Sequence, residues 1–233
     1  MWPSNNPISA YGLTAVLSSA TTLLATDPPA TAAPFIAVTE VPTPETALAQ
    51  RINEYAKSHL PEPTYNHSLR VYHFGLAIKR YRFPEWALTD ETYFLACLLH
   101  DIGTTQDHLE GTKMSFEFFG GLKSLEVLQN LQPSFVGGSV AVAPKDQAES
   151  VAEAVIRHQD LCEKDNTGSY ANLIHPSTIQ DVSSHFPRLK WSGCFASTIH
   201  EENRLKPWAH TTTLGEEEFP NKVLGNTLMA PYE

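Results

Sequence analysis

An apolar run that ends in an adjacent histidine and aspartate constrains this sequence more than any other feature. The run extends from Tyr93 to Leu99 and is followed directly by His100 and Asp101. Such a run predicts a buried helix, and burying a charged carboxylate without a partner costs several kcal/mol. A divalent cation bound by the pair would remove that cost. We therefore interpret His100 and Asp101 as the centre of a metal site.

A second histidine, His67, falls on the predicted buried face of an earlier helix. His67, Val71 and Phe74 are spaced four and three residues apart, which is the period of one helical face. A helix that begins near residue 66 would carry His67 in its first turn. A lone histidine on an apolar face is more often a hydrogen-bonded core residue. The combination of His67 with the later His–Asp pair nevertheless favours a metal site.

A third histidine, His158, ends an apolar stripe formed by Val151, Ala154 and Val155. Three predicted helices would therefore each direct one histidine into the interior. Imidazole nitrogens combined with a carboxylate suit Zn2+, Fe, Mn or Ni better than Mg2+ or Ca2+. We expect the site to be assembled in three dimensions, because its ligands come from different helices.

Hydrophobic periodicity along the chain predicts an all-α fold. The predicted helices cover residues 43–59, 66–82, 90–101, 115–131, 146–158, 176–185 and 189–202, and Gly120 and Gly121 interrupt the fourth. Gly103 is placed to close the third helix. Residues 1–42 predict an irregular N-terminal arm, residues 43–210 the domain itself, and residues 211–233 a C-terminal tail packed on the domain.

Composition limits the classes of function. The chain of 233 residues is 42% hydrophobic and 18% charged, which suits a single globular domain. A net charge of −10 and the lack of a Lys/Arg cluster argue against nucleic acid as a partner. No apolar run approaches the roughly 18 residues that a membrane span needs. Three widely spaced cysteines predict free thiols and hence a cytoplasmic protein, and the N-terminal arm indicates a possible homo-oligomer.

Two motifs resemble the HD-domain superfamily of metal-dependent hydrolases. They are residues 65–72, Tyr-Asn-His-Ser-Leu-Arg-Val-Tyr, and residues 98–104, Leu-Leu-His-Asp-Ile-Gly-Thr. Residues 113–121, 156–160 and 165–168 resemble, more narrowly, the fungal cyanamide hydratases. The resemblance extends from about residue 45 to residue 210.

The resemblance implies an HD-domain helical bundle that holds a zinc ion and adds water to cyanamide, giving urea. By motif position, the implied metal ligands are His67, His100, Asp101 and Asp165. A metal with an open position lowers the pKa of bound water toward about 7, and the resulting hydroxide would attack the nitrile carbon. His158 is the candidate for protonating the nitrile nitrogen or holding the substrate, and Asp101 for orienting the water. The expected substrate is a small neutral nitrile.

The sequence departs from this family pattern between His158 and Asp165. Only six residues separate them, and no apolar helix precedes Asp165. The pattern therefore indicates that the domain lacks one helix between residues 160 and 165. Asp160 is the alternative fourth ligand. A catalytically impaired HD-fold protein is the alternative to an active hydratase, because losing several core side chains at about 2–5 kcal/mol each exceeds ordinary stability.

An HD-type phosphohydrolase that acts on nucleotides is a further alternative. Such an enzyme requires Lys or Arg side chains near the metal to bind phosphate. Arg70, Lys113 and Arg157 are the candidates in this sequence. A neutral nitrile needs no such group, and the sequence has no basic patch, so the hydratase interpretation is preferred.

Overall fold

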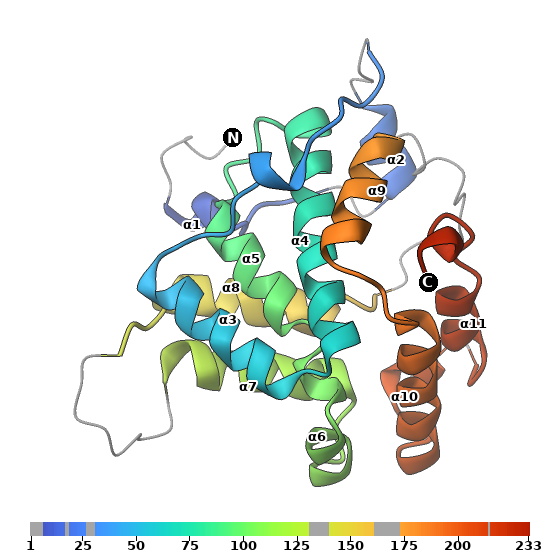
Figure 1. Ribbon diagram of the computed structural model, residues 1–233. Coiled ribbons are helices and arrows are strands. Elements are labelled where there is room, and N and C mark those ends of the chain that lie inside the picture. Colours follow the sequence, from blue (N-terminus) through green and yellow to red (C-terminus); the bar gives the residue numbers. More distant parts are fainter. Residues whose placement is uncertain (1–6, 17–18, 27–30, 131–139, 161–172, 214) are drawn as a thin grey trace.

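The computed structural model describes residues 7–16, 19–26, 31–130, 140–160, 173–213 and 215–233, and the structural statements below refer to these residues (Figure 1). Within them the chain forms helices and no strand, which confirms the predicted all-α fold. The α-helices are Pro7–Ala10 (α1), Ala20–Ala25 (α2), Ala47–His59 (α3), Glu62–Arg82 (α4), Asp90–Leu99 (α5), Gln106–Gly111 (α6), Phe116–Gln129 (α7), Lys145–Arg157 (α8), Pro176–His185 (α9), Trp191–Leu205 (α10) and Glu218–Leu224 (α11). Short 3-10 helices cover Val38–Glu40 (η1), Ile102–Thr104 (η2), His210–Thr212 (η4) and Ala230–Tyr232 (η5).

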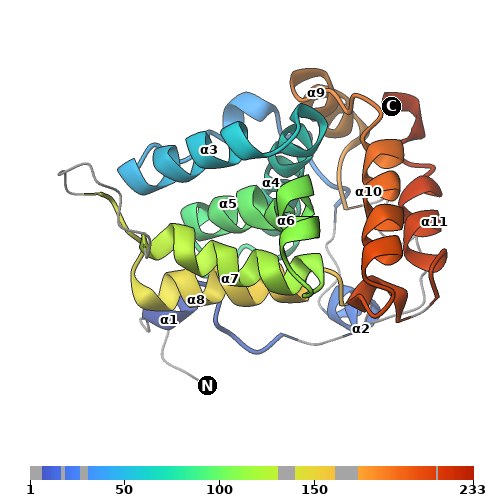
Figure 2. The same cartoon turned by 90° about the horizontal axis from the view of Figure 1, so that it is seen from below.

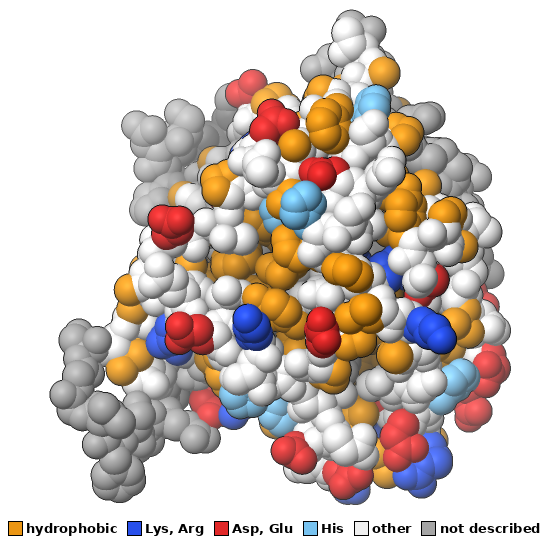
Figure 3. All heavy atoms as spheres, viewed as in Figure 1, with side chains coloured by type: hydrophobic (Ala, Val, Ile, Leu, Met, Phe, Trp, Pro, Cys, Tyr) orange, Lys and Arg blue, Asp and Glu red, His pale blue; other side chains and the backbone are white. Residues whose placement is uncertain are grey.

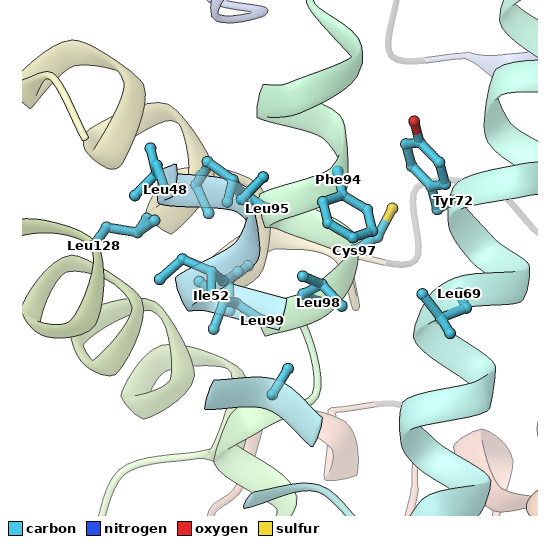
Figure 4. Close-up of a cluster of buried hydrophobic side chains, with 14 of the residues drawn as sticks. Leu48, Ile52, Leu69, Tyr72, Phe94, Leu95, Cys97, Leu98, Leu99 and Leu128 are labelled. Atoms are coloured by element: carbon cyan, nitrogen blue, oxygen red, sulfur yellow. The ribbon is translucent and has the colours of Figure 1, made fainter. Parts of the chain in front are cut away.

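The apolar run of the sequence becomes α5, the central helix of the bundle. It lies between α3 and α8, and α4 packs along it (Figure 2). The Thr89 side chain caps its N-terminus by accepting from the Thr92 backbone N–H, and Asp90 and Glu91 suit the positive end of the helix dipole. Figure 4 shows the core around it, where side chains of α3, α4 and α5 meet: Leu48, Ile52, Leu69, Tyr72, Leu95 and Leu98. α5 thus carries its C-terminal end, with His100, into the interior.

α4 begins earlier than predicted. Pro61 and Pro63 lie at its N-terminus, where a missing backbone donor and a fixed φ are tolerated, so the helix starts at Glu62. His67 consequently lies in the second turn and not in the first. The predicted stripe of Val71 and Phe74 is only half-buried, because α4 packs against the core with another face that includes Leu69, Tyr72 and Leu76. The stripe faces cavities instead.

The glycines of the fourth predicted helix do not interrupt it. α7 continues through Gly120 and Gly121. A Cβ at Gly121 would lie 2.4 Å from the Ile156 side chain, so this glycine permits the close packing of α7 on α8. Gly103 was predicted to close α5, but it lies within η2, and a Cβ there would be 2.0 Å from the Phe116 carbonyl oxygen. Gly121 therefore leaves room for the Ile156 side chain, whereas Gly103 is needed because two backbones approach each other.

The N-terminal segment contains two short helices and contacts the domain. The backbone N–H of Thr89 donates to the Ala10 carbonyl at 2.9 Å, and Arg82 Nη2 donates to the Leu24 carbonyl at 2.8 Å. The arm is thus less irregular than expected. The boundaries at residues 42 and 210 stay predictions.

The C-terminal helices α10 and α11 pack side by side at one end of the bundle (Figures 1 and 2). They enclose a second hydrophobic cluster that contains Leu109, Phe116, Trp191, Phe195, Ile199 and Phe219. This cluster brings Trp191 and Phe195 next to the histidines described below. The predicted lack of a helix between residues 160 and 165 concerns residues outside the described ranges. None of the described helices is long and apolar enough to cross a membrane.

Candidate metal centre

Three of the predicted ligands converge at the C-terminal end of α5. His67 comes from α4, His100 follows the last residue of α5, and Asp101 is next to it. Asp101 Oδ2 lies 3.1 Å from His100 Nε2 and 3.9 Å from His67 Nε2. One donor atom from each residue lies within 4.8 Å of the others, a spacing that would let the three bind one ion. In the part of the chain that the structure describes, no other group of this kind occurs.

His158 faces the same centre from the end of α8. Its Nε2 lies 3.7 Å from Asp101 Oδ1, and its ring packs edge-on against the His100 ring with centroids 5.2 Å apart. The Phe116 ring contacts the other side of His158, at a centroid distance of 5.6 Å. The apolar stripe of α8 therefore places His158 beside the three candidate ligands, as its spacing predicted.

Backbone carbonyls fix the tautomers of two histidines. His100 Nδ1 lies 2.7 Å from the Cys97 carbonyl oxygen, and His158 Nδ1 lies 2.5 Å from that of Val155. Since a carbonyl oxygen only accepts, each Nδ1 must carry the hydrogen. The lone pair of each neutral ring is then on Nε2, the atom that faces Asp101. Histidine ligands in metal sites are commonly oriented by this type of second hydrogen bond.

Asp101 is buried without hydrogen bonds. Its side chain is 1% exposed, and neither carboxylate oxygen has a hydrogen-bond partner. His158 Nε2 is also buried and unpartnered. Orphaned buried polar atoms are costly and uncommon in folded proteins. A divalent metal bound by the Asp101 carboxylate and the imidazole nitrogens of His67 and His100 would give the carboxylate the partner that it lacks.

The electrostatics of the cluster favour the metal-binding forms of Asp101 and His67. Burial opposes ionisation of Asp101, but the neighbouring His100, together with His158 and His67, outweighs burial and lowers the pKa of Asp101 far below its usual value. Burial lowers the pKa of His67, and the nearby His100 lowers that pKa further. Burial also acts to lower the pKa of His100, but the Asp101 carboxylate prevails and raises it. An ionised Asp101 and a neutral His67 are the forms that bind metals.

A cavity of about 430 Å³ opens onto these four side chains. We call it the histidine pocket. Apolar and aromatic side chains form most of its remaining wall, including Val71, Cys97, Trp191, Phe195, Phe219 and Val223. Among the described residues that line it there is no Lys or Arg. The arrangement offers a metal site at one end of an otherwise uncharged cavity.

Trp191 is a site residue that sequence reasoning missed. Its ring stacks on His67 with centroids 3.8 Å apart and planes at 15°. It fixes the orientation of His67 and separates the histidine pocket from a second cavity. No local signal connects it with His67, since Trp191 opens α10, far along the chain.

The remaining predicted residues that the structure describes do not join the cluster. Asp165 lies outside the described residues. Asp160, the alternative fourth ligand, lines a different cavity and pairs with Arg157 at 3.1 Å. Arg70 lines the second cavity, and Arg157 is largely exposed. Lys113 does not line the histidine pocket.

Comparison with known proteins agrees with this geometry. The sequence profile of the HD domain matches residues 64–181. The cyanamide hydratases DDI2 and DDI3 of Saccharomyces cerevisiae are each 42% identical to the chain over 203 residues, covering 80% of this chain and 86% of the relative. The 203 aligned positions exceed 80% of 233 residues, so both relatives carry residues with no counterpart here.

Proposed function

We propose that this chain, which belongs to the HD-domain family, is a metal-dependent hydratase that adds water to cyanamide and releases urea. The observation that carries the proposal is the buried Asp101, unpartnered by hydrogen bonds and in contact with His67 and His100. The identity to two proteins named cyanamide hydratase supports the choice of reaction. The uncharged histidine pocket suits a small neutral nitrile.

His67, His100 and Asp101 are the residues that would hold the metal, and zinc is the ion that their donor set favours first. When bound, the metal supplies the Lewis acidity that makes a water molecule nucleophilic near neutral pH. Cys97 also lines the pocket, but burial raises the pKa of its thiol to about 12, so it remains protonated and is a poor ligand.

Side chains of the protein would then transfer the proton from water to the nitrile nitrogen. Hydration breaks one O–H bond of water and one π bond of the nitrile, and it forms a C–O bond and an N–H bond. The isourea formed in this way becomes urea when its hydroxyl proton also moves to nitrogen. His158 is suited to this transfer because Nδ1–H is fixed by the Val155 carbonyl, leaving Nε2 to take up and return the proton. Asp101 Oδ1, at 3.7 Å, would stabilise the protonated ring. Asp101 thus combines the role of ligand with that of a positioning group.

Further parts of the proposal concern partners and location. On the face seen in Figure 3, Lys and Arg side chains are scattered singly and form no basic patch, which supports a protein without nucleic-acid partners. Cys97 is buried with a free thiol, which supports a reducing, cytoplasmic location. A homo-oligomer and the domain limits 43–210 remain part of the proposal, and Asp165 remains its fourth ligand.

The impaired form of the same enzyme is the second candidate. The relatives have residues that this chain lacks, and we propose that the missing segment falls between residues 160 and 165. A phosphohydrolase has no comparable support, because the described residues that line the histidine pocket include no Lys or Arg to bind a phosphate.

An activity profile at equal metal loading tests the proposal. The zinc-loaded chain is incubated with cyanamide, and separately with nucleoside monophosphates and triphosphates, while urea and inorganic phosphate are measured. The proposal expects urea and no phosphate. Phosphate release would instead identify a phosphohydrolase, and neither product from a metal-loaded chain would identify the impaired form.

A further inference from the structure

A second cavity, of about 400 Å³, shares a wall with the histidine pocket. We call it the arginine pocket. His67, Val71, Trp191 and Val223 line both cavities, so the stacked rings of His67 and Trp191 form part of the partition. The rest of the arginine pocket is lined by side chains that the proposed hydratase reaction does not use.

Cations gather around the arginine pocket. Arg70, Arg188 and Lys222 line it, and no Asp or Glu does so among the described residues. The two arginines are almost fully buried, at 1% and 4% exposure. Buried charges in proteins are normally paired. Lys222 Nζ lies 3.8 Å from Glu218 Oε1 and Arg188 also has a carboxylate partner, so of these three cations only Arg70 is left without an ion pair among the described residues.

Arg70 has an unused donor. Its Nη1 donates to the carbonyl oxygens of Phe186 and Pro187 at 2.8 and 3.0 Å, whereas Nη2 is buried without a hydrogen-bond partner. Burial and the nearby Arg188 lower the pKa of Arg70 to about 10, so the guanidinium is still charged at neutral pH. An unmade hydrogen bond from a charged donor costs more than one from a neutral donor.

Arg188 already binds a carboxylate. Its Nε donates to Glu233 Oε1 at 2.8 Å, and the Ser192 hydroxyl donates to the same oxygen at 2.6 Å. Glu233 is partly exposed and does not line the pocket. The Glu233 carboxylate therefore binds Arg188, and the Nη2 group of Arg70 has no hydrogen-bond acceptor.

We infer that the arginine pocket binds a small monocarboxylate with an apolar body. The carboxylate is held by Arg70 Nη2 with support from Arg188, because a guanidinium matches a carboxylate in plane and charge. The apolar body contacts Phe74, Ile179, Trp191 and Met229. These apolar walls favour a carboxylate with a hydrocarbon portion over inorganic phosphate. The site is independent of the proposed hydratase activity.

Calorimetric titration of the full chain tests this site. Benzoate is the probe, and benzamide is its neutral counterpart of nearly the same shape. We expect benzoate to bind with a stoichiometry of one, and benzamide at least about tenfold more weakly, because one charged hydrogen bond is worth about 1.5–3 kcal/mol. Binding is measured with and without EDTA, so that ligation of a metal in the histidine pocket is separated from binding at the arginines.

Variants then assign the site. Arg188→Leu and Arg70→Leu should each weaken benzoate binding at least about tenfold, whereas Glu233→Gln should tighten it by removing a competing negative charge. Arg204→Leu is the matched control, because Arg204 pairs with Glu201 on the surface of α10. Should Arg70→Leu fail to fold by circular dichroism, Arg188→Leu and Glu233→Gln still decide.

Three results would overturn the inference. Equal affinities for benzoate and benzamide would show that no charged group is recognised. Unchanged benzoate binding by the folded Arg188→Leu variant would place the ligand elsewhere. Tighter binding of inorganic phosphate than of benzoate would identify an oxyanion site in place of a carboxylate site. None of these results bears on urea formation from cyanamide.

Discussion

The histidine pocket and the arginine pocket share a wall but differ in charge. The first is lined by three histidines, one buried aspartate and apolar side chains, the second by three cations. Arg70 and Arg188 both help to lower the pKa of His67, although burial and His100 contribute more. The partition thus keeps positive charge out of the cavity where a metal would bind, while that charge still favours the neutral, ligand form of His67.

The difference in charge between the two pockets also determines which kind of ligand each one suits. Asp101 is the only ionised side chain among the described residues that line the histidine pocket, so the protein offers no Lys or Arg there to hold an anion beside the metal. A neutral nitrile needs only the metal, a proton carrier and apolar walls. Anions are instead expected beyond the partition, where Arg70 has an unused donor.

Removing a ligand should produce the largest effect. We expect His100→Ala to lose bound metal and urea formation together, because only two of the three clustered donors, those of His67 and Asp101, would remain. His200→Ala is the control, since His200 lies on the surface of α10 near Glu217. Metal content by mass spectrometry and urea release are measured on the same samples. Full activity of His100→Ala would remove the metal centre from the account.

Removing the proton carrier should produce the next largest effect. His158→Ala should keep near-stoichiometric metal and lose about 10²–10⁴-fold in kcat, the usual contribution of a general acid–base group. The pH profile of kcat should lose one limb. Loss of metal from this variant would instead make His158 a ligand.

Replacing Trp191, which forms part of the wall between the two pockets, should destabilise the fold and join the two cavities. Trp191 is 9% exposed and stacks on both His67 and Phe195. Trp191→Ala should therefore lower the free energy of unfolding by about 3–5 kcal/mol. Trp208→Ala, at a side chain that is 60% exposed, should change it far less. Guanidinium unfolding measures both, and equal small effects would show that Trp191 is not a packed part of the wall.

The sequence pattern predicted the ends of α5 and α8 better than it predicted the position of His67 in α4. The apolar run before His100 and the stripe before His158 are local signals, so the ends of α5 and α8 could be read from spacing. The predicted position of His67 within its helix was wrong by a turn, because that helix was predicted to begin near residue 66, whereas Pro61 and Pro63 allow α4 to begin at Glu62.

The arginine pocket was invisible in the sequence. Arg70 and Arg188 are far apart along the chain, so the lack of a Lys/Arg run said nothing about cations that the fold brings together. Trp191 was missed for the same reason. Gly103 was misinterpreted because a close approach between two backbones leaves no local pattern that distinguishes it from a helix cap.

The smallest expected effect is a pH dependence of stability caused by Glu202, which lies outside both pockets and contacts Phe116. Glu202 Oε1 accepts the Phe116 backbone N–H at 2.7 Å, and burial together with Glu117 raises the pKa of Glu202 to about 7. An unfolded glutamate titrates near pH 4.3, so the folded chain binds more protons between these values. The free energy of unfolding should therefore fall as the pH rises from about 4 to about 7.

Glu202→Gln isolates this contribution, since it keeps an acceptor for the Phe116 N–H and removes the titration. Between pH 5 and pH 8 the free energy of unfolding should fall by about 1–3 kcal/mol more in the parent than in the variant. Denaturant unfolding at both pH values measures the difference. Parallel pH dependences in the two proteins would contradict the raised pKa.

The metal content of the purified chain tests the central claim most directly. The chain is expressed without added metal, passed through a desalting column, and analysed by mass spectrometry for zinc, iron, manganese and nickel. The account predicts close to one equivalent of a single metal, lost in the His67→Ala and His100→Ala variants. A folded, helical chain that carries no metal, and takes up none from added zinc, would contradict the account.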